Sequence, residues 1–230
     1  LLVLTRAIGL MGVIYVPFLT IGLLRQTIIE IVTEQVAFLM TVLGYDPVVV
    51  DGLSHNGIEI ASKQYPYENT FWFDSNERPI TYTIILACTG IGSISIFAGG
   101  ILAVDAPWRR KLRVLVAAVS IIYVLNLIRN LGIALAFGLQ KAQFFPETVM
   151  TVFGLSDAQL VSYYIVDRMV AQFGSVIVLV GLTWVLMREL PELTVIVEDL
   201  LFLVTGTEYD LGTAFEKNQS ESSPATPGDD

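Results

Sequence analysis

Long apolar stretches separated by short polar segments dominate the chain. A helix that crosses a membrane needs about 20 mainly apolar residues. The pattern predicts such helices over residues 7–24, 82–104, 112–138 and 161–187. A shorter stretch, 28–43, carries Glu30 and Glu34 on one face. This segment either spans the membrane at a tilt or lies at its interface, and we favour a spanning helix.

Composition strengthens the prediction of a membrane protein. Hydrophobic residues make up 54% of the 230 residues, charged residues only 15%, and the mean hydropathy is +0.67. These values are too apolar for an ordinary soluble domain. The sequence therefore predicts an all-α polytopic protein of the cell membrane, in which residues 1–188 form a helical bundle.

Basic residues predict how the bundle is oriented, because Lys and Arg accumulate in short cytoplasmic loops. The strongest basic cluster consists of Arg109, Arg110, Lys111 and Arg113. It places that turn in the cytoplasm. Alternation of the spans then places residues 44–81 and 139–160 on the outer face.

The outer segment 44–81 has features of a small β structure. It contains VVVDGLSHNGIEI, in which two β-branched runs flank an Asn56-Gly57 pair suited to a hairpin turn, and then the aromatic stretch YPYENTFWF. We expect a small extracytoplasmic cap resembling a β-hairpin. An interfacial loop with its aromatic side chains in the membrane belt is the alternative. His55, the only histidine, is interpreted as a surface residue of this turn rather than a catalytic base.

The two ends of the chain lead to different expectations. The segment 189–230 holds ten acidic residues and one lysine, which predicts an acidic cytoplasmic tail that contains a surface helix and is disordered from about residue 218. Such a charge argues against nucleic acid as a partner. At the other end, Leu1 opens inside an apolar run, so we expect further spans upstream of it.

Two predicted spans carry an arginine, Arg129 and Arg168, and a third carries the only cysteine, Cys88. An arginine at the centre of a membrane helix costs at least about 2.5 kcal/mol, so each is a functional candidate. Helical rise places Arg129 about 24 Å, Arg168 about 30 Å and Cys88 about 32 Å from their cytoplasmic anchors. In a hydrocarbon core of about 30 Å, all three belong to the outer part of the membrane.

Each arginine has polar neighbours at helical spacing. Asn126 and Asn130 flank Arg129, and Tyr164 lies four residues before Arg168. We expect these stripes to face the interior of the bundle. Asp167 directly precedes Arg168, so its side chain points elsewhere, and we expect it to pair with a different helix.

A cysteine near two arginines suits acyl transfer. The thiolate is the reactive form of cysteine, and nearby positive charge lowers the thiol pKa. Arginine also binds oxyanions and carboxylates through its planar fork of donors. Simpler interpretations stay open: Cys88 as an inert packing residue, the arginines as structural ion-pair partners, and Gly90 as a contact between helices.

No zinc-ligand cluster, phosphate-binding loop, nucleophile elbow or nucleotide fingerprint occurs in the sequence. The sequence therefore predicts neither a metal nor a cofactor.

Three short motifs resemble the exosortase and archaeosortase family, closest to its haloarchaeal archaeosortase branch. They are ACTGIGS around Cys88, NLIRN around Arg129 and the DR pair that ends at Arg168. The resemblance covers residues 82–187 by motif. It implies the catalytic triad Cys88, Arg129 and Arg168, with arginine where many bacterial members have histidine. Asn126, Asn130, Gly90 and Tyr164 are supporting candidates.

The resemblance implies a membrane cysteine transpeptidase with its active site near the extracytoplasmic face. It would remove C-terminal PGF-type sorting signals from secreted proteins, such as S-layer glycoprotein, and join the new C-terminus to a membrane lipid. Two alternatives stay open. One is a membrane cysteine peptidase that releases its product to water, and the other is an anion transporter that uses Arg129 and Arg168 without Cys88.

Overall fold

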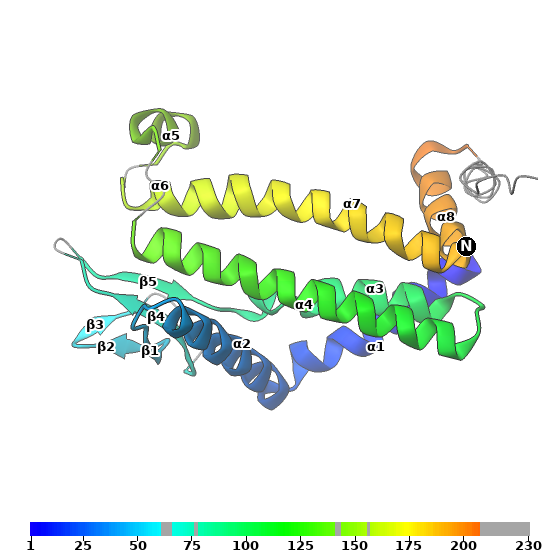
Figure 1. Ribbon diagram of the computed structural model, residues 1–230, viewed down its shortest axis with the longest axis horizontal. Helices are drawn as coiled ribbons and strands as arrows, with labels where there is room; N and C mark the ends of the chain where they lie inside the picture. The colour runs from blue at the N-terminus through cyan, green and yellow to red at the C-terminus, as the bar shows by residue number, and fades with distance from the viewer. Residues whose placement is uncertain (61–65, 76–77, 141–143, 156, 208–230) are drawn as a thin grey trace, which may run out of the picture. The chain divides into compact units, whose positions relative to one another are not determined.

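The computed structural model describes residues 1–60, 66–75, 78–140, 144–155 and 157–207. The disorder expected from about residue 218 lies outside these residues. The α-helices are α1 (Leu2–Thr20), α2 (Gly22–Val42), α3 (Ile91–Ala103), α4 (Trp108–Gly138), α5 (Pro146–Phe153), α6 (Leu160–Tyr163), α7 (Gln172–Glu189) and α8 (Thr194–Thr205) (Figure 1). The other helical turns are η1 (Leu86–Thr89), the π-helical η2 (Tyr164–Ala171) and η3 (Pro191–Leu193).

Three helical stretches of the described chain are long and apolar enough to cross a membrane. They are α1, α4 and the continuous run of residues 160–189 through α6, η2 and α7. The sequence predicted spans close to these three. The predicted span over 28–43 corresponds to α2, whose charged residues Arg25, Glu30 and Glu34 keep it out of this group.

The predicted helix over residues 82–104 is wrong in its first part. Residues 80–83 form a strand, and the helix α3 begins only at Ile91 and has 13 residues. The physical reason is a turn at Gly90, which adopts φ +79, a left-handed conformation that ends the preceding turn. The apolar composition of 82–104 thus hides a change from extended to helical backbone.

The chain divides into two compact units. The first contains residues 1–14, 95–119 and 180–230. Within it α1 and α3 approach closely, because a side-chain carbon on Gly99 would lie 2.6 Å from the Ala7 carbonyl oxygen. Arg110 forms an ion pair with Glu192 at 3.1 Å.

The second unit contains residues 15–94 and 120–179 and includes all the strands. The strands are β1 (Val48–Asp51), β2 (Ser54–His55), β3 (Ile58–Glu59), β4 (Glu68–Phe73) and β5 (Ile80–Thr83). β1, β4 and β5 form an antiparallel sheet in that order, and β2 pairs with β3 as a separate hairpin. The turn predicted at Asn56-Gly57 is present, but it joins only β2 to β3, and the β-branched run Val48–Val50 pairs with β4 in the three-stranded sheet instead.

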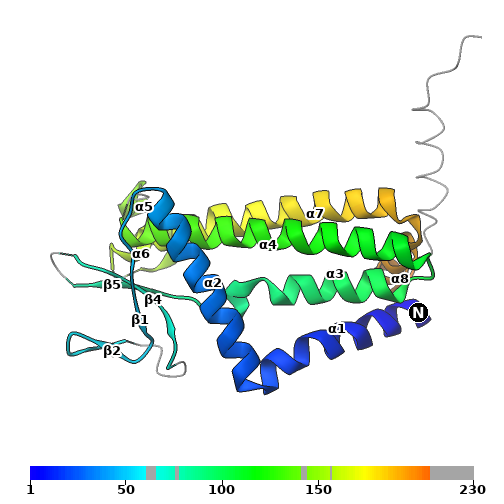
Figure 2. The same ribbon diagram turned by 60° about the horizontal axis from the view of Figure 1, so that its bottom comes forward.

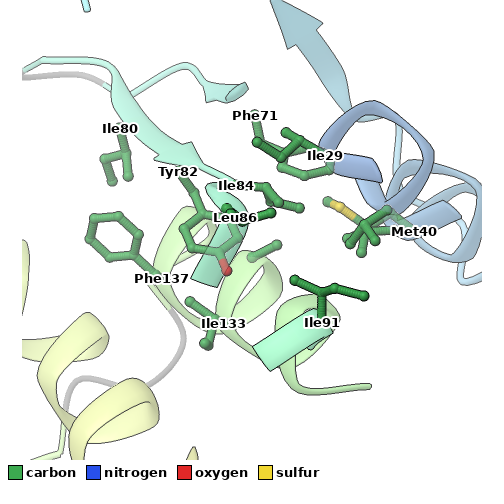
Figure 3. Close-up of a cluster of buried hydrophobic side chains, with 13 residues drawn as sticks. Ile29, Met40, Phe71, Ile80, Tyr82, Ile84, Leu86, Ile91, Ile133 and Phe137 are labelled. Atoms are coloured by element: carbon green, nitrogen blue, oxygen red, sulfur yellow. The ribbon is translucent and has the colours of Figure 1, made fainter. Parts of the chain in front are cut away.

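One face of the sheet packs on helices to make the core of this unit. Phe71 and Tyr82 from the sheet join Ile29 and Met40 from α2 and Ile133 from α4, and all are buried (Figure 3). α2 packs against β4 and η1 (Figure 2). Alternation along the strands explains the pattern, since every second side chain of a strand points to the same face.

Candidate active site

Cys88 lies in η1, the single turn that connects β5 to α3. Its main-chain N–H donates to the Ile85 carbonyl at 2.8 Å, and its side chain is half-buried. Gly90 closes the turn in a left-handed conformation. The thiol therefore lies in a short 3-10 turn a few residues after β5 and before the start of α3.

Two asparagines of α4 hold the backbone of Cys88. Asn126 and Asn130 each donate a hydrogen bond from Nδ2 to the Cys88 carbonyl oxygen, both at 2.7 Å. Asn130 also donates to the Asn126 carbonyl at 2.9 Å and is only 2% exposed. Their spacing of one helical turn lets both carboxamides reach one acceptor.

Tyr82 extends this network into the sheet. Its hydroxyl donates to Asn130 Oδ1 at 2.9 Å, and its ring stacks on Phe71 with centroids 6.3 Å apart. Burial raises the Tyr82 pKa well above its ordinary value. The hydroxyl therefore stays protonated and fixes Asn130 with its amide directed at Cys88.

Arg129 forms an ion pair with Asp167 of η2, with 2.9 Å between Nη2 and Oδ1. Asp167 is 8% exposed, and the prediction that it pairs with a different helix is confirmed. The buried Nε of Arg129 has no hydrogen-bond partner among the described residues. A buried donor without a partner is costly, and such groups occur at functional sites.

A cavity of about 480 Å³ connects these groups. This size is within the range of small-ligand and substrate sites. Its lining is mainly apolar and consists of Ile60, Thr81, Tyr82, Thr83, Ile85, Cys88, Arg129, Asn130, Ile133, Phe137, Leu160, Tyr163 and Asp167. The thiol and the guanidinium thus open into the same space.

The groups around Cys88 have opposing effects on the pKa of its thiol. Burial raises the pKa of the Cys88 thiol above its ordinary value, and Asp167 adds to this effect, whereas Arg129 lowers it. Burial has the largest effect, so the resting site favours the neutral thiol. A nucleophilic role for Cys88 would therefore require a proton acceptor or a change in the Arg129–Asp167 pair.

The sequence-predicted residues differ in where the structure places them. Cys88, Arg129 and Asn130 line the cavity, and Asn126 and Gly90 lie next to it. A side-chain carbon on Gly90 would lie 3.1 Å from Asn126 Cγ, a tight contact, and the left-handed backbone at φ +79 adds strain for any other residue.

Arg168 and Tyr164 are outside the lining of this cavity. The Arg168 side chain is exposed, and Tyr164 packs against the Phe153 ring with centroids 5.3 Å apart. Both belong to the π-helical stretch η2, which changes the direction in which side chains leave the helix. The sequence argument assumed ordinary helical spacing and so assigned Tyr164 to the interior, where Tyr163 lines the cavity instead.

Tyr82 is the main residue that sequence reasoning missed. Its alternation with Ile80 and Ile84 in ITYTI was the available signal, but the apolar run that follows obscured it. His55 packs edge-on against Trp72, at 4.8 Å between centroids, and is absent from the cavity lining. Among the described residues, no group of three or more His, Cys, Asp or Glu side chains could hold a metal ion.

Comparison with known proteins gives consistent matches. Residues 1–161 match the family model of the transmembrane exosortases. The chain is 43% identical to archaeosortase A of Haloferax volcanii and 41% identical to archaeosortase A of Natronomonas pharaonis, over 92% of its own length in both cases. It spans 69% and 65% of those two proteins, respectively. No solved structure matches the chain significantly.

Proposed function

Because the chain belongs to the transmembrane exosortase family, we propose that it removes C-terminal PGF-type sorting signals from secreted proteins and transfers the new C-terminus to a membrane lipid. Its similarity to the archaeosortases identifies the chain as a sortase-like membrane enzyme, a cysteine transpeptidase. The observation that carries the proposal is the shared cavity of Cys88 and Arg129.

In the proposed reaction, the Cys88 thiolate attacks the carbonyl carbon of the scissile peptide bond. The tetrahedral intermediate collapses to a thioester as the C–N bond breaks, and the departing amine takes up a proton. An amine of a lipid headgroup then attacks the thioester, forms an amide and returns the thiol. Both half-reactions need a group that stabilises the negative oxygen of the intermediate.

Arg129 is suited to that stabilising role. Asp167 engages one end of its guanidinium, and its buried Nε has no partner among the described residues. Asp167 therefore orients the arginine while a donor remains for an oxyanion. A charge-assisted bond of this kind is shorter and stronger than one between neutral groups.

Arg168 would act on a different part of the reactants. Its side chain is exposed and lies outside the lining of the cavity. An exposed guanidinium of this kind is suited to bind a lipid phosphate or a substrate carboxylate outside the cavity. The roles of Tyr164 and of the other supporting residues are proposals of the same kind.

We place the active site at the extracytoplasmic face of a multi-pass bundle. The basic cluster at the start of α4 indicates that this end of the helix is cytoplasmic, and Arg129 lies about 24 Å beyond Arg113 along the same helix. The sheet of β1, β4 and β5 would then form the outer cap, and the acidic segment after Glu189 would be cytoplasmic. This geometry suits secreted substrates such as S-layer glycoprotein, whose sorting helices would lie in the same membrane.

The mass of the processed product tests the proposal. The complete protein is expressed in an archaeal host that lacks its own archaeosortase, together with a secreted reporter that ends in a PGF-type signal. We expect a reporter shortened at the signal and heavier by a lipid. A product whose mass fits a free carboxyl end would establish a peptidase that transfers to water, and an uncut reporter would contradict both.

The anion-transporter alternative remains distinguishable because it makes no use of the thiol. It predicts that both Arg129 and Arg168 are essential while Cys88→Ala functions normally. The position of Cys88 beside Arg129 in one cavity favours the enzyme.

A further inference from the structure

The cavity follows the free edge of β5. Tyr82 points to the face of the sheet that stacks on Phe71, whereas Thr83 points to the opposite face, where its hydroxyl lies 3.0 Å from that of Thr70. Thr81, Tyr82 and Thr83 all line the cavity. A cavity lined by side chains from both faces of one strand must run along the edge of that strand.

The main-chain groups at this edge are directed away from β4. The Ile84 N–H donates to the Asn69 carbonyl at 2.8 Å, in register with the antiparallel pairing of β4 and β5. Because N–H groups alternate sides along a strand, Tyr82 also faces β4, and Thr81 and Thr83 face the other way. Among the described residues, no strand pairs with this edge of β5.

β1, at the other edge of the same sheet, carries more features that oppose strand pairing than β5 does. β1 follows Pro47, ends at Asp51 and has an irregular register between Val50 and Asp51. Proline, charge and such irregularities are the usual means by which proteins prevent pairing at an exposed edge. β5 also follows a proline, Pro79, but its own residues Ile80–Thr83 carry no charge and pair with β4 in unbroken register, and Thr81 and Thr83 are only partly buried.

The edge also leads directly to the nucleophile. After Thr83 the chain continues through Ile84 and Ile85 into η1, where Cys88 closes the turn onto Ile85. Strand edge and thiol line one continuous cavity. A peptide bound along the edge of β5 would therefore reach Cys88 with a peptide bond that lies a few residues further along that peptide.

Building on the proposed function, we propose that an extended segment of the substrate polypeptide binds as an additional strand along β5, bonded to the main chain of Thr81 and Thr83, and so presents its scissile carbonyl to Cys88. Outward-facing groups two residues apart repeat at about 7 Å, a spacing that an extended peptide matches and a lipid does not. Main-chain bonds give affinity in such strand addition, while the pockets give specificity. The apolar walls formed by Ile85, Ile133 and Phe137 favour uncharged substrate side chains.

A proline at Thr81 tests the inference, because it removes the outward N–H without breaking the ladder to β4. Thr81→Val changes the same side chain but keeps that N–H. Val49→Pro is the matched control, since by the same alternation Val49 directs its N–H to the outer edge of β1, away from Cys88. All three are compared with wild type for processing of the PGF-bearing reporter, at matched abundance in the membrane.

We expect Thr81→Pro to process about five- to tenfold more slowly than Thr81→Val, the effect of losing one hydrogen bond to substrate. Val49→Pro should stay within about twofold of wild type. If Thr81→Pro and Thr81→Val process the reporter at equal rates while the wild type is active, strand addition is overturned and the proposed function is unaffected. An inactive wild type would instead contradict the proposed function.

A second measurement covers the case in which Thr81→Pro does not accumulate. Synthetic substrate peptides are N-methylated one residue at a time before the scissile bond and offered to the wild-type enzyme. Strand addition predicts that methylation slows processing at every second residue, because only alternate N–H groups face β5. Uniform effects, or none, would overturn the inference.

Discussion

The two amide bonds to the Cys88 carbonyl make a quantitative prediction. Asn126→Ala and Asn130→Ala each remove one of the two 2.7 Å donors. A hydrogen bond of this type contributes about 0.5–1.5 kcal/mol. If it holds the thiol in its reactive position, each single variant should process substrate about two- to twelvefold more slowly.

The double variant should lose more than the product of the two single effects. After one substitution the remaining asparagine still satisfies the carbonyl, but after both the carbonyl has no side-chain donor. An unpaired polar group in a buried setting costs about 1–3 kcal/mol, so we expect a coupling of at least about 0.5 kcal/mol, or about twofold.

The assay is the rate of reporter processing, normalised to the abundance of each variant in the membrane. Tyr82→Phe is the comparison variant, since it leaves both donors to the Cys88 carbonyl in place and removes only a hydroxyl, which bonds Asn130 at 2.9 Å and interacts with the Cys88 side chain. Its effect should be smaller than that of the double variant. Strictly multiplicative losses would refute the coupling between the two asparagines, and rates that follow protein abundance alone would refute their positioning role.

Three further predictions concern the same site. Because burial raises the Cys88 pKa, alkylation of the thiol should accelerate as the pH rises through values above its ordinary pKa of about 8.5. Asp167→Asn should lower the pH midpoint of alkylation, and Arg129→Gln should raise it. Shifts of the same sign in both variants would contradict the opposing effects of Asp167 and Arg129 on the thiol. Gly90→Ala should impair processing through the left-handed backbone and the contact with Asn126, whereas Gly92→Ala, with open space around it, serves as the tolerated control. Arg129→Lys should reduce kcat about 10²–10³-fold, as loss of an oxyanion donor does, and near-normal turnover would show that charge alone suffices.

Much of the helical framework could be predicted from the sequence. Apolar runs of sufficient length identified the positions of α1, α4 and the stretch of residues 160–189. The signal fails where one apolar run contains two structures, as between Ile80 and Ala103. Hydropathy is the same for a buried strand and a buried helix, so only the alternation in ITYTI and the turn at Gly90 separate them.

The sequence predicted which residue types form the candidate site, but it predicted less well which of these side chains contact one another. Spacing placed Asn126 and Asn130 beside Arg129, but their shared acceptor on Cys88 depends on a turn that the predicted helix excluded. Adjacency to Arg168 indicated that Asp167 pairs elsewhere, and the ion pair with Arg129 agrees. The π-helical geometry of η2 has no signature in the sequence, so Tyr163 and Tyr164 could not be told apart.

The central claim is that Cys88 is the nucleophile, and its most direct test is the processing of a PGF-bearing reporter by Cys88→Ala at wild-type abundance. We predict that this variant leaves the reporter at full length, because no other group in the described cavity supplies a thiol. Normal processing with the thiol absent would contradict the claim.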